Sequence, residues 1–286
     1  MSDTKASTPS ADDRIIPIYD LEQTAIFACK ADPRFHYCLY VPSGVAKGDK
    51  VDLAVAIHGS GRNSAFEFRD RFSGFGRWNR CAILCPIFPI GVRGDGARSG
   101  YKYMEEGNIR YDRLLLAMVD EVAAKYDQTW DQFAIFGFSG GGHFAHRFAI
   151  LHPGKLWAAS IGAPGSVTLL DPTRDWWVGI RDLKARFGID FDAQALAKVP
   201  VQMLVGDADL ETWEITHRPG GSYWMEGAND AGRTRPERIE TLRASFQAAG
   251  VDVRLEILPG VSHDRLQVLG RVQDFWAWIL TSRRGG

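Results

Sequence analysis

The sequence Phe136-Gly137-Phe138-Ser139-Gly140-Gly141-Gly142 decides how the rest of the chain is interpreted. An apolar run, residues 133–136, precedes it, and a run of helical character, residues 143–151, follows it. A serine with glycines two residues before and two residues after it, between a strand and a helix, is typical of a nucleophile elbow. The chain turns so sharply there that larger neighbouring side chains would collide. Such a turn exposes the serine hydroxyl and points the positive end of the helix at whatever the serine attacks.

Composition and charge narrow the class of protein. The 286 residues suffice for one large α/β domain, and 45% of them are hydrophobic and 24% charged, as in ordinary soluble proteins. The 34 basic and 35 acidic residues leave a formal charge of −1, which argues against nucleic acid or an anionic membrane as a partner. No stretch of sequence is long and apolar enough to span a membrane.

The amino-terminal residues 1–14 are polar and contain no apolar stretch of signal-peptide length. We therefore expect a disordered tail, followed by a single domain over residues 15–286, in a cytoplasmic protein. Four cysteines are too few for a disulfide scaffold, and Cys81 and Cys85 lie in an apolar run where buried thiols are expected. No second pair of ligands accompanies them, so we predict no metal site.

Apolar runs alternate with amphipathic stretches along most of the chain. The alternation predicts an α/β fold, with a mostly parallel central sheet and helices on both faces. Residues 164–198 break the alternation and are predicted to form a small cap-like insertion. Strands are expected at residues 23–29, 35–41, 51–57, 82–87, 133–136, 156–161, 201–205 and 253–258, and helices near residues 64–71, 111–122, 143–151, 239–249 and 269–279.

A serine nucleophile needs a general base, and the base needs a third group that holds it in place. His263 fits the base, because it lies in the loop directly after the last expected strand. Asp207 and Asp209 both follow the strand 201–205, so either would complete the order serine, acid, histidine. We favour Asp209 as the acid, because Asp207 is typical of a turn residue that accepts backbone N–H bonds.

Donors for an oxyanion are expected from two glycine-rich places. The turn Ile57-His58-Gly59-Ser60-Gly61 follows the first buried strand and can aim backbone N–H groups at the serine. The helix start at Gly140 supplies another N–H group. His58 itself is expected to brace this turn rather than to transfer protons.

Taken together, these motifs resemble those of the α/β-hydrolases over nearly the whole chain, residues 35–280. In that family the acid stands three residues after the glycine that ends its strand, which matches Asp209. The oxyanion N–H groups come from the residue after the His-Gly pair and the residue after the nucleophile, here Ser60 and Gly140. The early part of the chain is similar to polyhydroxyalkanoate-depolymerase-like and feruloyl-esterase-like hydrolases. The resemblance implies a triad of Ser139, Asp209 and His263 that requires no cofactor.

Residues that recognise the substrate are expected in the loops after the strands, where ligands gather in open α/β sheets. Arg93 and Arg98, in a glycine-rich loop with Tyr101, are predicted to contact an anionic or polar group; the alternative is a solvated loop. Aromatic and histidine side chains of the two irregular segments are predicted to line the pocket, unless they pack the insertion against the core: Trp176, Trp177, Trp213 and His217.

The sequence therefore predicts a carboxylesterase-type serine hydrolase that acts on a small-molecule ester through an acyl-enzyme. An amidase, a peptidase or a C–C-bond hydrolase would use the same triad, and these alternatives stay open. A non-catalytic protein that only binds a ligand is a further alternative, although it would not need all three triad residues. The partner is predicted to be a small-molecule ester or amide, and the oligomeric state is left open.

Overall fold

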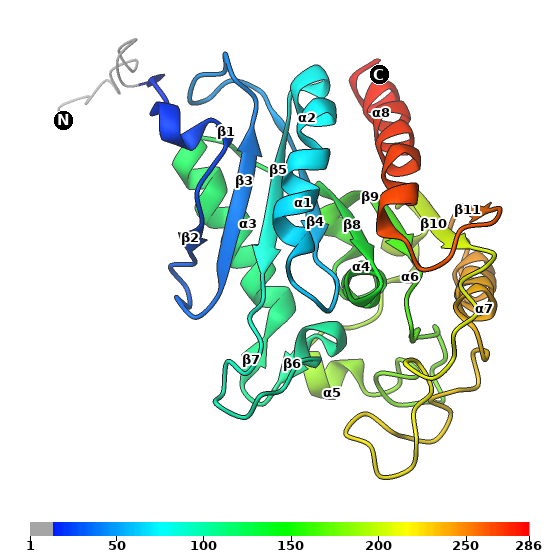
Figure 1. Ribbon diagram of the computed structural model, residues 1–286. Helices are drawn as coiled ribbons and strands as arrows, with labels where there is room; N and C mark the ends of the chain where they lie inside the picture. The colour runs from blue at the N-terminus through cyan, green and yellow to red at the C-terminus, as the bar shows by residue number, and fades with distance from the viewer. Residues whose placement is uncertain (1–13, 286) are drawn as a thin grey trace, which may run out of the picture.

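The computed structural model describes residues 14–285, so all but the last residue of the predicted amino-terminal tail lies outside the described residues (Figure 1). Its centre is a nine-stranded sheet in the order β1-β3-β5-β4-β8-β9-β10-β11, with β2 also paired to β3. All pairs from β5 through β4 to β11 are parallel, whereas β1, β2 and β5 pair with β3 in antiparallel fashion. The strands are β1 (Glu22–Gln23), β2 (Phe27–Ala28), β3 (His36–Val41), β4 (Asp52–Ile57), β5 (Cys81–Ile87), β8 (Phe133–Phe138), β9 (Leu156–Gly162), β10 (Val201–Gly206) and β11 (Val253–Leu258).

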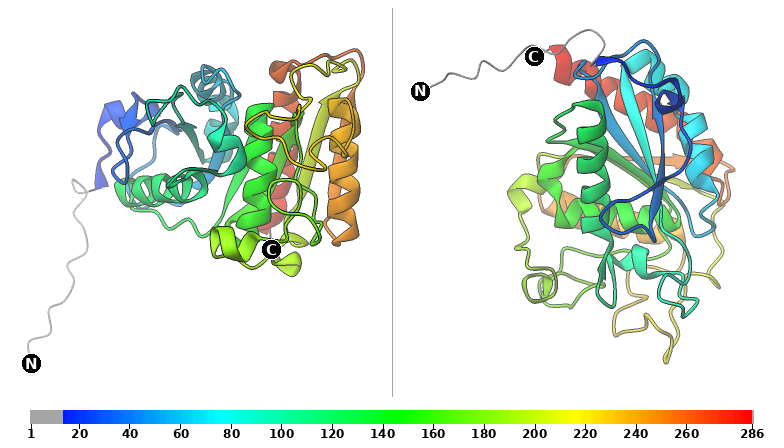
Figure 2. Two further views of the ribbon diagram at one scale, coloured as in Figure 1. Left: turned by 90° about the horizontal axis from the view of Figure 1, so that it is seen from below. Right: turned by 90° about the vertical axis from the view of Figure 1, so that its left-hand side faces the viewer.

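Helices cover both faces of this sheet, which confirms the predicted α/β architecture (Figure 2). One face carries α1 (Ser64–Arg71), α2 (Ser73–Asn79) and α8 (Leu269–Gly285), and the other carries α3 (Tyr111–Tyr126), α4 (Gly140–Leu151) and α7 (Arg235–Ala248). The shorter elements are η2 (Ile18–Asp20), η3 (Gly100–Tyr103), β6 (Glu105–Glu106), β7 (Ile109–Arg110), η4 (Pro153–Lys155), α5 (Leu183–Phe187), α6 (Ala193–Leu196) and η5 (Arg265–Val268).

The core lies between the sheet and these two helix layers. Every residue of β8 and β9 is buried, because helices cover both faces of the central strands. On one face, the indole of Trp276 in α8 stacks on Phe72, with ring centroids 5.2 Å apart. All four cysteines are free and buried, as expected for Cys81 and Cys85.

Some elements differ from those expected. The predicted strand 23–29 is divided into β1 and β2, and the glycine-rich loop 89–107 contains η3 and β6, which pairs with β7. Helix α2 was not predicted, since it contains two glycines. Gly76 lets it pack closely on the sheet: a Cβ at this position would overlap the Cys81 carbonyl and the Tyr40 ring.

Two irregular segments, residues 163–200 and 207–234, extend beyond the carboxyl ends of the parallel strands (Figure 1). The first contains the predicted insertion 164–198, with α5 and α6. The two segments contact each other: the Trp177 indole donates to the Tyr223 carbonyl at 3.1 Å, and Arg174 pairs with Asp230 at 2.7 Å. Among the helices of residues 14–285, none combines the length and apolar character that a membrane span requires.

Candidate active site

Ser139 lies in a sharp turn between β8 and α4. Its φ of 57° and ψ of −116° are unusual for a residue with a side chain, and such conformations cost about 1–3 kcal/mol. Backbone bonds on both sides hold the turn in place: the Ser139 N–H donates to the Gly162 carbonyl at 2.9 Å, and the Ser139 carbonyl accepts from the His143 N–H at 3.1 Å. The strand, turn and helix therefore have the arrangement predicted for an elbow.

Two positions beside the turn must be glycine, because the backbone of another segment comes very close to each of them. A Cβ at Gly137 would overlap the backbone of Gly141, and a Cβ at Gly141 would overlap the carbonyl of Ile57. The helix α4 thus sits directly on the ends of β8 and β4, and no larger residue fits at either position.

Replacing Gly141 by Ala is expected to lower the free energy of unfolding by about 3 kcal/mol, because the added methyl group meets backbone that cannot move aside. Urea unfolding followed by circular dichroism measures this. Gly270→Ala is the matched control, because Gly270 is an exposed helical residue with open space around it, and this change should be neutral or stabilise by up to about 1 kcal/mol. Equal stabilities of the two variants would contradict the packing argument.

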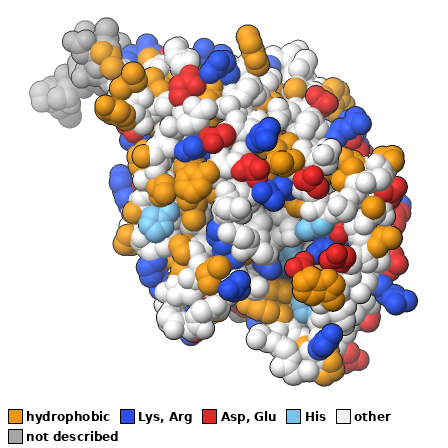
Figure 3. Space-filling view, in the orientation of Figure 1, with side chains coloured by type: hydrophobic (Ala, Val, Ile, Leu, Met, Phe, Trp, Pro, Cys, Tyr) orange, Lys and Arg blue, Asp and Glu red, His pale blue; other side chains and the backbone are white. Residues whose placement is uncertain are grey.

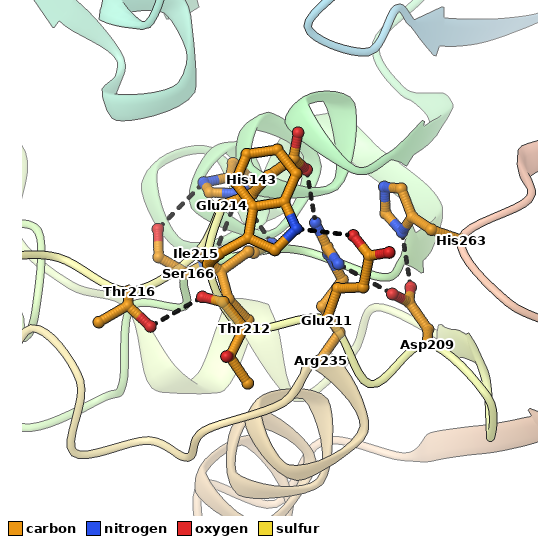
Figure 4. Close-up of polar contacts among 12 residues, drawn as sticks. His143, Ser166, Asp209, Glu211, Thr212, Glu214, Ile215, Thr216, Arg235 and His263 are labelled. Carbon is orange, nitrogen blue, oxygen red and sulfur yellow. Dashed lines mark hydrogen bonds and ion pairs between the residues drawn. The ribbon is translucent and has the colours of Figure 1, made fainter.

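The structure brings His263 and Asp209 together, although they lie 54 residues apart (Figure 4). The His263 Nδ1 is 2.6 Å from the Asp209 Oδ2, and the imidazole packs against the Phe138 ring at 4.8 Å between centroids. A carboxylate accepts from Nδ1–H, so Nε2 is left free to take a proton. Asp207 instead accepts from the Gly260 N–H at 2.7 Å, which is the turn role expected for it.

Arg235, the first residue of α7, also belongs to this network and was not predicted from the sequence. Its Nη1 is 2.8 Å from the second carboxylate oxygen of Asp209, and its Nη2 is 3.2 Å from Glu214 (Figure 4). The side chains of Arg235 and Asp209 are only 3% and 1% exposed. A cation in the first turn of a helix opposes the helix dipole, and this signal could have indicated a separate role for Arg235.

Replacing Arg235 by Met is expected to lower the free energy of unfolding by about 3 kcal/mol, because a buried Asp209 oxygen loses its charged partner. Chemical denaturation measures this loss. Arg243→Met on the same helix is the control, since Arg243 pairs with Glu240 at the surface and such pairs contribute at most about 1 kcal/mol. Similar losses in both variants would show that the Asp209–Arg235 pair adds little.

The predicted oxyanion donors lie next to each other. A Cβ built on Gly140 would lie 3.0 Å from the Ser60 nitrogen, so the loop after β4 and the start of α4 are in contact. His58 braces this loop: its Nε2 accepts from the Phe88 N–H at 3.0 Å, and its Nδ1–H donates to the Gly59 carbonyl at 2.8 Å. Burial lowers the pKa of His58 to about 3, so the ring is neutral.

Arg62 and Tyr101 support the same loop. The Arg62 guanidinium donates to the carbonyls of Ser60 at 2.5 Å, Phe88 at 2.9 Å and Arg98 at 2.6 Å. Tyr101 was predicted to contact substrate, but its ring is buried beneath the loop and its hydroxyl donates to the His58 carbonyl at 3.4 Å. Its contacts are therefore those of a residue that holds the loop.

A cavity of about 390 Å³ opens beside Ser139 and Ser60. In the lower half of Figure 3, basic, acidic and histidine side chains border a hollow in this face of the molecule. Trp213 and His217, two of the residues expected to recognise substrate, line the cavity. Four of its other lining residues were not predicted from the sequence: Lys102, His143, Glu214 and Arg235.

The remaining predicted substrate residues lie elsewhere. The Arg93 guanidinium faces Asp95 at 3.9 Å and is not among the residues that line the cavity. Arg98 lines a neighbouring cavity of about 570 Å³. Trp176 and Trp177 border a third cavity, of about 460 Å³, and their indole N–H groups donate to backbone carbonyls, which makes them packing residues of the insertion. None of these four side chains borders the cavity at Ser139.

No protein-family model matches the chain, and no curated protein matches it. Many solved structures are similar. Poly(aspartic acid) hydrolase-1 from Sphingomonas sp. KT-1 superposes with a TM-score of 0.67 at 21% identity, over 84% of this chain and 92% of that one. A poly(3-hydroxybutyrate) depolymerase from Bordetella parapertussis gives 0.67 at 21% identity, over 85% of both chains. An S-formylglutathione hydrolase from Agrobacterium tumefaciens superposes with a TM-score of 0.56 at 16% identity, over 91% of this chain and 98% of that one. The chain therefore has the α/β-hydrolase fold.

Proposed function

We propose that this protein is a serine hydrolase that cleaves carboxylic esters of small molecules through an acyl-enzyme. The observation that carries the proposal is the position of Ser139. It occupies a strained turn beside a cavity, in a fold whose His263 and Asp209 are hydrogen-bonded to each other at 2.6 Å. Strain at a residue that borders a cavity is typical of a functional site.

In the proposed reaction, the Ser139 hydroxyl attacks the ester carbonyl while His263 accepts its proton. Asp209 stabilises the imidazolium and holds the tautomer in which Nδ1 carries hydrogen. The N–H groups of Ser60 and Gly140 donate to the negative oxygen of the tetrahedral intermediate. His263 then protonates the leaving alcohol, and water attacks the acyl-enzyme by the same route.

Arg235 has a positioning role in this proposal. It binds the Asp209 oxygen that His263 does not use, and so prevents the carboxylate from rotating away from the imidazole. The buried His143 in the site instead holds the backbone after β9: its Nε2 accepts from the Gly165 N–H at 2.8 Å. Burial lowers the pKa of His143 well below its usual range, which leaves it neutral and unsuited to the proton transfer proposed for His263.

Labelling with a fluorophosphonate probe tests the proposal. We expect one covalent adduct, which peptide mass spectrometry assigns to Ser139. A panel of short-chain, long-chain and aromatic esters, with the corresponding amides and a C–C-bond substrate, then determines the class of bond. A folded protein that is not labelled would favour the non-catalytic alternative, and labelling with turnover of amides alone would favour the amidase.

A further inference from the structure

The cavity at Ser139 contains a lysine without a negative partner. Lys102, on η3, is half-buried and lines the cavity together with Ser139 and Ser60. Within residues 14–285, its ammonium group makes neither an ion pair nor a hydrogen bond. Glu214 is the carboxylate that also lines this cavity, and it is already 3.2 Å from Arg235.

The charges around Lys102 are mostly positive. Arg62, Arg147 and Arg235 lie near enough to repel its ammonium group, and Glu214 attracts it. Burial, together with this repulsion, lowers the pKa of Lys102 to about 8. The side chain is therefore still mainly protonated at neutral pH, in surroundings that favour the addition of a negative charge.

Two buried arginines strengthen this positive field, because they are bound by neutral groups. Arg147 is fully buried and donates to the hydroxyls of Thr168 and Ser166 and to the Lys102 carbonyl at 2.6 Å. Arg238 is 1% exposed and donates to the carbonyls of Gly165, Ile215 and Gly232 and the side-chain oxygen of Asn229. Neither arginine pairs with a carboxylate within residues 14–285.

The two histidines that line the cavity, His143 and His217, are both neutral at neutral pH. Burial and the nearby cations Arg238, Arg147 and Lys102 lower the pKa of His217 to about 4, and burial keeps His143 neutral as well. The net charge in and around the cavity thus stays positive over the neutral range, and low-dielectric walls make such a field stronger for a bound ion.

We infer that the cavity accepts esters that carry a carboxylate close to the scissile bond, and that Lys102 is the residue that binds this carboxylate. The inference rests on the proposed function and specifies its substrate class. A cavity of about 390 Å³ has room for a small acidic acyl or alcohol group beside Ser139. The positive groups are Lys102 and its neighbours, rather than the predicted Arg93, which lies outside the cavity.

The test compares matched acidic and neutral esters. In the first pair, monoethyl succinate has its carboxylate on the acyl side, and ethyl pentanoate is its neutral counterpart. In the second pair, 4-acetoxybutanoate has its carboxylate on the alcohol side, and pentyl acetate is its neutral counterpart. For the wild type, we expect a higher kcat/KM for the acidic member of one pair. Lys102→Met should lower that value by about 10- to 100-fold, mainly through KM, and should change the neutral ester less than about 3-fold. The affected pair identifies the side that carries the charge.

Two control variants separate charge from structure. Lys102→Arg should restore part of the loss, because it keeps the positive charge. Arg93→Ala removes a cation outside the cavity and should leave both members of each pair unchanged. In the wild type, the preference for the acidic ester should fall as the pH rises through about 8, where Lys102 loses its charge, and it should stay level in Lys102→Arg.

A binding measurement keeps this inference distinct from the proposed chemistry. Calorimetric titration of Ser139→Ala with succinate should show binding that Lys102→Met in the same background weakens by about 10-fold or more. If the wild type hydrolyses no ester but succinate binding depends on Lys102, the proposed reaction fails and the anion site stands. Equal losses for acidic and neutral esters in Lys102→Met, or esterase activity without any preference for acidic esters, would overturn the anion site.

Discussion

Replacing Ser139 by Ala is expected to lower kcat for every ester that the protein cleaves by about 10⁴-fold or more, and to abolish fluorophosphonate labelling. The change removes one oxygen atom from a residue that borders the cavity, so little packing is lost. It also relieves no strain, since Ala has the same difficulty as Ser with a φ of 57°. Initial-rate kinetics and the thermal midpoint, measured on the same preparation, separate chemistry from folding.

Ser282→Ala is the matched control for this substitution. Ser282 lies on the exposed side of α8, where its hydroxyl donates to the Trp278 carbonyl, and its loss should leave both activity and labelling unchanged. If Ser139→Ala keeps most of the activity while it remains folded, the serine is not the nucleophile and the acyl-enzyme is excluded.

Replacing Asp209 by Asn is expected to reduce kcat by about 10⁴-fold. The amide cannot stabilise an imidazolium, and its NH₂ group facing Nδ1 favours the tautomer of His263 that carries no hydrogen there. The loss should not add to that of Ser139→Ala, because the two residues act in one unit. Steady-state kinetics of the two single variants and the double variant measure this coupling.

Asp207→Asn is the control for the acid, because it lies two residues away and also follows β10. Among the described residues, its carboxylate accepts only from the Gly260 N–H, a bond that an amide oxygen can also accept, so kcat should change by less than about 10-fold. Small and equal effects of the two substitutions would place the orienting carboxylate elsewhere, with Asp264 the next residue to test.

Local patterns were sufficient to predict the frame of the site. The strands predicted from apolar runs begin and end within one or two residues of the observed β4, β9, β10 and β11. They could be predicted because strands that are covered on both faces are apolar throughout. The glycines beside Ser139 indicated a sharp turn, since the conformation they permit is a property of a few consecutive residues. His263 and Asp209 were found because both follow strands whose carboxyl ends share one edge of the sheet.

Elements without a strong local pattern were missed. The helix α2 contains Gly74 and Gly76, which disfavour a helix, and only its packing against Tyr40 and the sheet accounts for it. The predicted strand 23–29 became two short pairs at the sheet edge. In both places, contacts with residues that are distant in the sequence decide the structure. Such contacts cannot be predicted from the neighbouring residues.

Three properties depend only on neighbouring residues: the period of apolar residues, the chemistry of turns and the order of motifs. These properties determined the α/β architecture and the placement of Ser139, Asp209 and His263 after its strands. The charges that surround these residues come from remote parts of the chain. Arg235 reaches Asp209 from the start of α7, and Lys102 reaches the cavity from η3, whereas Arg93 faces Asp95 and does not line the cavity. Electrostatic interactions depend on distance in space, so only the tertiary structure decided which cations face Ser139.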